Sequence, residues 1–138
     1  MAVHPRFANL IIHGKKKVEF RKRSFSARVS HVVIYATSPI KKVLGFCEVS
    51  DIDEGTPNAL WVKYGKISGI KKRECMTYYN TSRNAVAIKV KKAKKLDRPL
   101  DLRELGRSIK PPQSFMYLSN KQFDVVVDAH KRPTRKKA

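Results

Sequence analysis

Three charged side chains lie close together between Gly14 and Arg21 and could do chemistry. Lys16 stands at the start of an alternating stretch, and Glu19 and Arg21 follow it two residues apart. Residues two apart in a β-strand project from the same face, so we expect Glu19 and Arg21 side by side. A carboxylate beside a guanidinium forms a charge-assisted pair that leaves other arginine donors free for a phosphate or a base edge. The alternative is an ion pair that only orders the rim of the sheet.

The composition points to a polyanionic partner. The 138 residues include 31 Lys+Arg against 11 Asp+Glu, a net charge of +20. An excess of this size is typical of a nucleic-acid binder. RNA is the expected partner and DNA the alternative, because both carry the same phosphates. An anionic membrane is a weaker candidate, since the sequence has no evident basic amphipathic helix or lipidation signal. The basic residues expected to contact phosphates around Glu19 are Lys15, Lys16, Lys17, Arg21, Lys22 and Arg23.

A second group of candidate contact residues follows Pro111-Pro112. Gln113, Ser114 and Phe115 offer an amide, a hydroxyl and an aromatic ring directly after this rigid dipeptide. Aromatic rings near basic residues suit base stacking and phosphate contact in single-stranded RNA. Phe115 is an equally good core residue. Ser38, in a turn after a predicted strand, is either a ligand contact or a turn hydroxyl.

Local patterns predict the elements that position these residues. Helices and strands are interspersed, which favours one mixed α+β domain with a small barrel or curled sheet and helices outside it. Gly14 is expected to end the first helix, Thr56 to cap the second, and Gly45 to mark a bulge or a close backbone approach. The predicted helices cover 5–13, 56–65, about 70–79 and 120–129, with a turn or short helix in 100–109; the predicted strands cover 17–22, 31–36, 42–52 and 84–96.

Gly14, Lys16, Glu19 and Arg21 occupy every fixed position of the pattern GxKxxExR, after a short helix and at the start of a strand. The similarity continues in three further segments, 33–39, 44–49 and 111–115. In this order the segments resemble the ASCH domain, a branch of the PUA-like superfamily, over residues 3–129. The resemblance implies a PUA-like curled β-sheet or small β-barrel with flanking short helices and a cleft beside the GxKxxExR strand. It also implies a link to RNA binding, and in some members to chemistry on RNA or modified nucleosides.

The chain is accordingly predicted to contain one ASCH domain, residues 1–129, and a basic, disordered tail, residues 130–138. No apolar run approaches the ~20 residues of a membrane helix, and no signal peptide is evident. We therefore expect a cytoplasmic protein. Its two cysteines, Cys47 and Cys75, are expected to be reduced, with Cys47 buried in the core.

Two functions remain open from the sequence. The first is nucleic-acid binding, above all RNA binding, by a basic cleft beside the GxKxxExR strand. The second is a small enzyme acting on RNA or a modified nucleoside, either a metal-dependent ribonuclease or an amidohydrolase with Lys16 as base and Glu19 as its partner. Some superfamily members with amidohydrolase activity carry Thr at the place of Glu19, a point at which this sequence departs from them.

No metal site and no cofactor is predicted. The clustered acids Asp51, Asp53 and Glu54 fit a loop at a strand end better than a Mg²⁺ site. The four histidines show no ligand spacing and are expected to be exposed or locally hydrogen-bonded.

Overall fold

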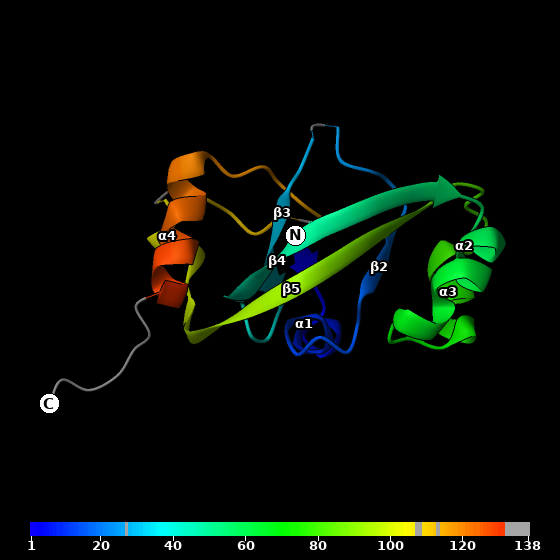
Figure 1. Cartoon of the computed structure of the whole chain (residues 1–138), viewed down its shortest axis with the longest axis horizontal. Helices are drawn as coiled ribbons and strands as arrows, with labels where there is room; N and C mark the ends of the chain where they lie inside the picture. Colours follow the sequence, from blue (N-terminus) through cyan, green and yellow to red (C-terminus); the bar gives the residue numbers. More distant parts are fainter. Residues whose placement is uncertain (27, 107–108, 113, 132–138) are drawn as a thin grey trace, which may run out of the picture.

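A computed structural model of the chain describes residues 1–26, 28–106, 109–112 and 114–131. Strands and helices are interspersed along these residues (Figure 1). The elements are β1 (Ala2–Val3), α1 (Pro5–Ile12), β2 (Val18–Arg21), β3 (His31–Ala36), β4 (Lys42–Gly55), α2 (Pro57–Tyr64), the 3₁₀ helix η1 (Gly65–Ile67), α3 (Lys72–Tyr79), β5 (Ala85–Leu100), the 3₁₀ helix η2 (Leu102–Glu104) and α4 (Asn120–Lys131).

The strands form one curled sheet in the order β1-β3-β4-β5-β2. β1 runs parallel to β3, and the other neighbouring pairs are antiparallel. β1 and β2 are the two edges, so over the described residues the sheet is open rather than a closed barrel. The prediction of a mixed α+β fold with a curled sheet and flanking short helices is confirmed.

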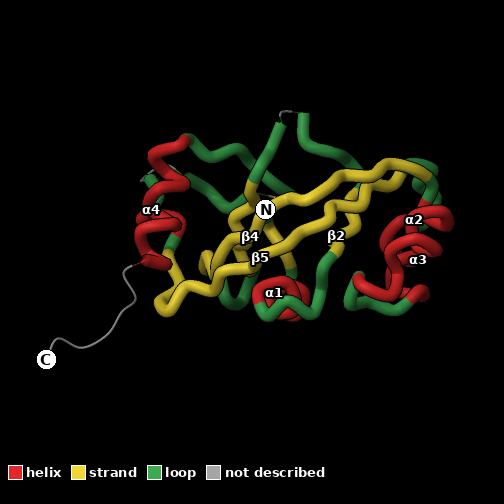
Figure 2. Tube along the Cα trace, viewed as in Figure 1, coloured by secondary structure: helices red, strands yellow, loops and turns green. Residues whose placement is uncertain are grey.

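The two longest strands form the spine of the molecule. β4 has 14 residues and β5 has 16. Figure 2 shows both running between α4 at one end and the α2–α3 pair at the other. None of the described helices combines the length and apolar character needed to cross a membrane.

Helix ends lie where capping residues predict them. Gly14 has φ +76°, a left-handed conformation that favours glycine, and follows the end of α1. The Thr56 hydroxyl accepts a hydrogen bond from the backbone N–H of Ala59 at 3.2 Å. At α4, the backbone N–H of Gln122 donates to the Ser119 hydroxyl at 3.1 Å, and the Ser119 N–H donates back to Gln122 Oε1 at 2.8 Å. This reciprocal capping box starts the last helix.

Gly45 marks a close backbone approach, as predicted. A Cβ at this position would lie 2.2 Å from the carbonyl oxygen of Lys94 and 2.8 Å from Ile12 Cδ1. The pairing of β4 with β5 also shifts register between Val43 and Gly45. Only a residue without a side chain lets α1 and β5 approach β4 this closely.

The apolar core is divided into three clusters along the spine. The first packs α1 against the middle of the sheet, the second lies beneath α4, and the third lies beneath α2 and α3. Both cysteines are free and buried, Cys47 in the first cluster and Cys75 in the third. Fully buried members of the three clusters include Ile11, Ile34, Ile88, Val43, Leu96, Val126, Val18 and Tyr79.

Candidate functional site

The three charged residues of the GxKxxExR segment are buried together. Lys16, Glu19 and Arg21 are 2%, 8% and 9% exposed. Lys16 Nζ lies 3.4 Å from Glu19 Oε1, and Arg21 Nη2 lies 3.0 Å from Glu19 Oε2. The expected Glu19–Arg21 pair is therefore present, and the carboxylate between the two cations offsets part of their charge inside the protein.

Lys16 is not the mobile, solvent-facing cation expected at the entrance of the strand. Its ammonium group donates to the carbonyl oxygen of Ser68 and lies 5.4 Å from the centre of the Phe7 ring. Burial lowers the pKa of Lys16, while the neighbouring Glu19 carboxylate acts in the opposite direction. A phosphate or substrate could touch this amine only after displacing the residues that cover it.

Arg21, on β2, forms hydrogen bonds with two segments that are distant in sequence, those of Ala2 and Ser114. Its Nη2 donates to the carbonyl oxygen of Ala2 at 2.6 Å, and its Nη1 donates to the Ser114 hydroxyl at 3.1 Å. The backbone N–H of Ala2 in turn donates to the carbonyl oxygen of Ser114 at 2.7 Å. The terminal nitrogens expected to be free for a ligand are thus used within the protein, and the buried Nε has no partner among the described residues. Arg21 holds the segment that continues into Phe115.

Of the remaining predicted contact residues, Ser114 contacts this buried group through Arg21. Ser38 is exposed in the turn after β3, Ser114 and Phe115 are half-buried, and Gln113 lies outside the described residues. The cations that flank the motif are exposed on the surface; they are Lys15, Lys17, Lys22 and Arg23. The sequence predicts an open cleft along the Gly14–Arg21 segment. In the structure, the charged side chains at the centre of this segment are instead buried and contact other parts of the protein.

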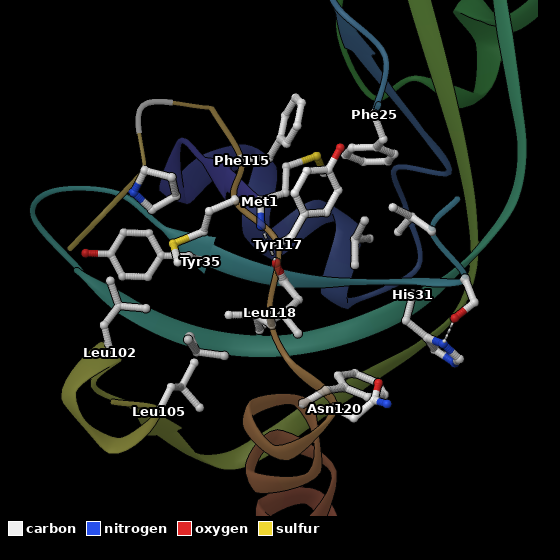
Figure 3. Close-up of a pocket in the computed structure, with 18 of the residues that line it drawn as sticks. Met1, Phe25, His31, Tyr35, Leu102, Leu105, Phe115, Tyr117, Leu118 and Asn120 are labelled. Atoms are coloured by element: carbon white, nitrogen blue, oxygen red, sulfur yellow. Dashed lines mark hydrogen bonds between the residues drawn. The ribbon is translucent and has the colours of Figure 1, made fainter. Parts of the chain in front are cut away.

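A pocket of about 250 Å³ lies on another part of the sheet, between β3, the loop that precedes it, η2, residues 115–118 and the start of α4 (Figure 3). Five aromatic rings line it among aliphatic side chains, together with one guanidinium and one imidazole. We call it the aromatic pocket; its aromatic and basic members are Phe25, Tyr35, Phe115, Tyr117, Phe123, Arg28 and His31.

The rings of the aromatic pocket hold one another in place. The Phe25 and Phe115 centroids lie 4.9 Å apart at an interplanar angle of 83°, and Phe115 contacts Tyr117 edge-on at 6.0 Å. The backbone N–H of Ser26 donates to the Tyr117 hydroxyl at 2.7 Å, which ties the loop before β3 to the opposite wall. Edge-to-face geometry is favourable for such pairs, so the rings form a preorganised wall.

Of the contact residues predicted from the sequence that the structure describes, only Phe115 lines this pocket. Phe25, Arg28, His31 and Phe123 could not be grouped with it, because they come from separate segments that only the tertiary structure brings together. The one usable signal was the position of Phe115 directly after a rigid Pro-Pro dipeptide.

The acidic stretch at the end of β4 is used in surface contacts. Asp53 accepts hydrogen bonds from Lys63 Nζ and the Tyr64 hydroxyl, both at 2.8 Å, and these bonds lower the pKa of its carboxyl. Over the described part of the chain, no three His, Cys, Asp or Glu side chains are grouped as a metal site would require.

Three of the four histidine rings have a local partner, as expected. Examples are His13 Nδ1, 2.8 Å from the carbonyl oxygen of Asn9, and His31 Nδ1, 2.9 Å from the Ser30 hydroxyl. His130 differs from the expectation: it is half-buried, and its Nδ1 lies 3.2 Å from the carbonyl oxygen of Lys95 on β5.

Comparison with known proteins identifies the family. The ASCH domain family matches residues 1–97. A protein of Zymomonas mobilis known as an ASCH domain-containing ribonuclease is 32% identical over 131 residues, which cover 92% of this chain and 88% of that protein. The crystal structure of ASCH from Zymomonas mobilis superimposes with a TM-score of 0.86 and 32% identity over 93% of this chain and 92% of that one.

A large ribosomal subunit protein of Ureaplasma parvum is 38% identical over 104 residues, 75% of this chain but only 33% of that protein. The family match and the Zymomonas relative both span most of the sequence and include the GxKxxExR segment. The chain belongs to the ASCH domain family, within the PUA-like superfamily.

Proposed function

We propose that this protein binds single-stranded RNA and stacks a base in the aromatic pocket. The observation that carries the proposal is the gathering of five aromatic rings, one guanidinium and one imidazole around one pocket, in a chain with a net charge of +20. Unstacked bases of single-stranded RNA are recognised by stacking on aromatic rings and arginine planes, while nearby cations neutralise the backbone. A duplex hides its base faces and would not fit this lining.

The size of the pocket supports a single base as its occupant. Its volume of about 250 Å³ lies just below the range for small-molecule sites, roughly 300–1,000 Å³. A flat heterocycle stacked against the wall formed by Phe115 and the rings that contact it would use a surface that is already in place.

In this proposal the GxKxxExR segment acts mainly by positioning. Arg21 holds Ser114, and Ser114 is followed directly by the stacking residue Phe115. The exposed cations around the motif, with Ser38 and Gln113, remain candidates for contacts to the rest of the strand; the cations are Lys15, Lys17, Lys22 and Arg23.

Ribonuclease activity is a second candidate, favoured by one specific observation. The Zymomonas relative bears the name ribonuclease and is 32% identical over 92% of this chain. His31, which lines the aromatic pocket, is of the residue type that most often transfers protons in catalysis. The alternative of an amidohydrolase centred on Lys16 and Glu19 is less well supported, because both side chains are covered by the protein.

Binding is tested by fluorescence anisotropy with labelled oligouridylate of about eight nucleotides, 2′-O-methylated so that the 2′-hydroxyl cannot take part in cleavage. We expect Phe115→Leu, which keeps apolar bulk but removes the stacking face, to weaken binding on the order of tenfold, since stacking contributes about 1–3 kcal/mol per base. Tyr78→Leu is the matched control, because this exposed ring lies on α3 and does not line the pocket. The proposal is wrong if the wild-type protein does not bind, or if the two variants bind equally well.

Cleavage is tested on unmodified RNA of the same sequence, with Mg²⁺ and with EDTA in parallel. The ribonuclease candidate predicts shorter products from the wild-type protein and fewer from Phe115→Leu. If the RNA stays intact under both conditions while the methylated strand binds normally, the protein binds RNA but is not a ribonuclease.

A further inference from the structure

A second pocket of about 550 Å³ adjoins the aromatic pocket. The two share residues 28–31, at the end of the loop and the start of β3. The second pocket then continues onto β4 and β5. We call it the polar pocket; its lining residues are Arg28, Val29, Ser30, His31, Glu48, Val49, Ser50 and Lys91.

The polar pocket differs from its neighbour in chemistry. Arg28 and Lys91 bring exposed cations to it, and Ser30 and Ser50 bring hydroxyls. Glu48 is the carboxylate in this lining, and its Oε2 lies 3.9 Å from the ammonium group of Lys92 outside the lining. Lys92 therefore offsets part of this negative charge, and the cations of the pocket keep their attraction for an anion.

His31 stands where the two pockets meet. Its Nδ1 lies 2.9 Å from the Ser30 hydroxyl, which orients the ring, and its Nε2 has no partner among the described residues. Its ring also packs against Phe123 of the aromatic pocket, with centroids 5.2 Å apart. One residue thus borders an aromatic, base-sized space on one side and a cation-lined space on the other.

We infer that the polar pocket is a phosphate subsite, and that the ligand is an oligonucleotide rather than a free nucleoside. The inference rests on the proposed function. Bases and phosphates alternate along any single strand. The aromatic pocket matches the chemistry of a base, and the adjoining polar pocket matches that of a phosphate. The strand runs from the aromatic pocket past His31 and across β4 and β5, where Arg28 and Lys91 neutralise its backbone.

The test compares ligands that differ in the number of phosphates. Isothermal titration calorimetry is run with uridine and with 2′-O-methyl oligouridylates of increasing length. We expect affinity to rise steeply once a phosphate reaches the polar pocket. Lys91→Gln should weaken binding of the oligonucleotides several-fold, leave uridine binding unchanged, and reduce the slope of log K against log[salt] by about 0.7, the contribution of one phosphate contact on a single strand.

A second variant gives an effect of opposite sign. Glu48→Gln removes the carboxylate from the polar pocket, so oligonucleotide binding should become several-fold tighter. A damaged fold cannot produce this gain. Lys72→Gln, which removes the same charge from α3 outside both pockets, is the matched control and should bind as the wild type does.

The outcomes separate the inference from the proposed function. If no oligonucleotide binds to the wild-type protein, the proposed function itself is wrong. If binding depends on Phe115 but is the same in wild type, Lys91→Gln and Glu48→Gln, RNA binding stands and the polar pocket is not a phosphate subsite. Equal affinity for uridine and for the longer strands would also overturn the inference.

Discussion

The Glu19 carboxylate pairs with two cations that would otherwise be buried without a counterion. Its two carboxylate oxygens contact different partners, Lys16 and Arg21. Burial of an ion pair contributes little net stability, because desolvation offsets much of the attraction. Removal of one member is different, because the remaining charges stay inside the protein without their counterion.

Glu19→Gln should therefore destabilise the fold by about 3–5 kcal/mol, the range observed when a buried pair is broken. Urea unfolding followed by circular dichroism measures this change in free energy. Glu54→Gln, at an exposed carboxylate near the end of β4, is the control and should stay close to the wild-type value. Equal stability of the two variants would show that Glu19 does not hold the buried cations.

The residue pattern predicted which charges meet but not where they lie. Alternation along β2 was sufficient to place Glu19 beside Arg21. The burial of Lys16 depends on Phe7 and Ser68, which approach it from α1 and from the end of η1. Such contacts arise from tertiary structure and cannot be predicted from local spacing. The sequence alone therefore predicts a solvent-facing cleft at this motif.

At the scale of the elements, the approach of β5 to β4 depends on Gly45. Gly45→Ala places a methyl carbon 2.2 Å from the carbonyl oxygen of Lys94, and backbone cannot give way as a flexible side chain can. We expect a loss of stability of about 3 kcal/mol, at the upper end of the usual range for overpacking. Thermal unfolding provides the measurement.

Gly55→Ala is the matched control in the same strand. A Cβ there would meet its nearest neighbour, Leu60 Cδ2, at 3.7 Å, an ordinary contact. This variant should unfold close to the wild-type temperature, and a similar loss in both variants would contradict the steric explanation.

Most elements could be predicted because each has a local signal. The Ser119–Gln122 spacing predicted the start of α4, and Gly14 predicted the end of α1. The extension of β5 from residue 96 to Leu100 had no such signal, since it depends on pairing of Leu100 with Val43 of β4. The walls of the aromatic pocket were unpredictable for the same reason: they are assembled from separate loops.

At the scale of the whole molecule, several of the few carboxylates are held in ion pairs over the surface. The hydrogen bond from Arg6 lowers the pKa of Glu74, and the one from Arg98 lowers the pKa of Glu104. Their folded-state pKa values are thus below those in the unfolded chain, so the unfolded state binds more protons as these groups titrate. The resulting stability is present above the unfolded pKa and is lost as the pH falls.

The melting temperature should accordingly fall between about pH 5 and pH 3, the range in which such carboxyls take up protons. Loss of negative charge from a chain of net charge +20 adds self-repulsion in the same direction. Calorimetric scans across this range test the expectation, and Glu104→Gln should show a shallower fall than the wild type. A melting temperature that does not change with pH would contradict it.

The spine of β4 and β5 separates the α2–α3 pair from both pockets. Neither pocket takes a lining residue from the excursion between Gly55 and Ala85, and Figure 1 shows these helices at the end of the molecule opposite α4. An affinity tag or fluorescent label grafted into the turn at residues 80–84 would therefore leave both pockets accessible. The same turn is also a suitable site for immobilising the protein on a sensor surface.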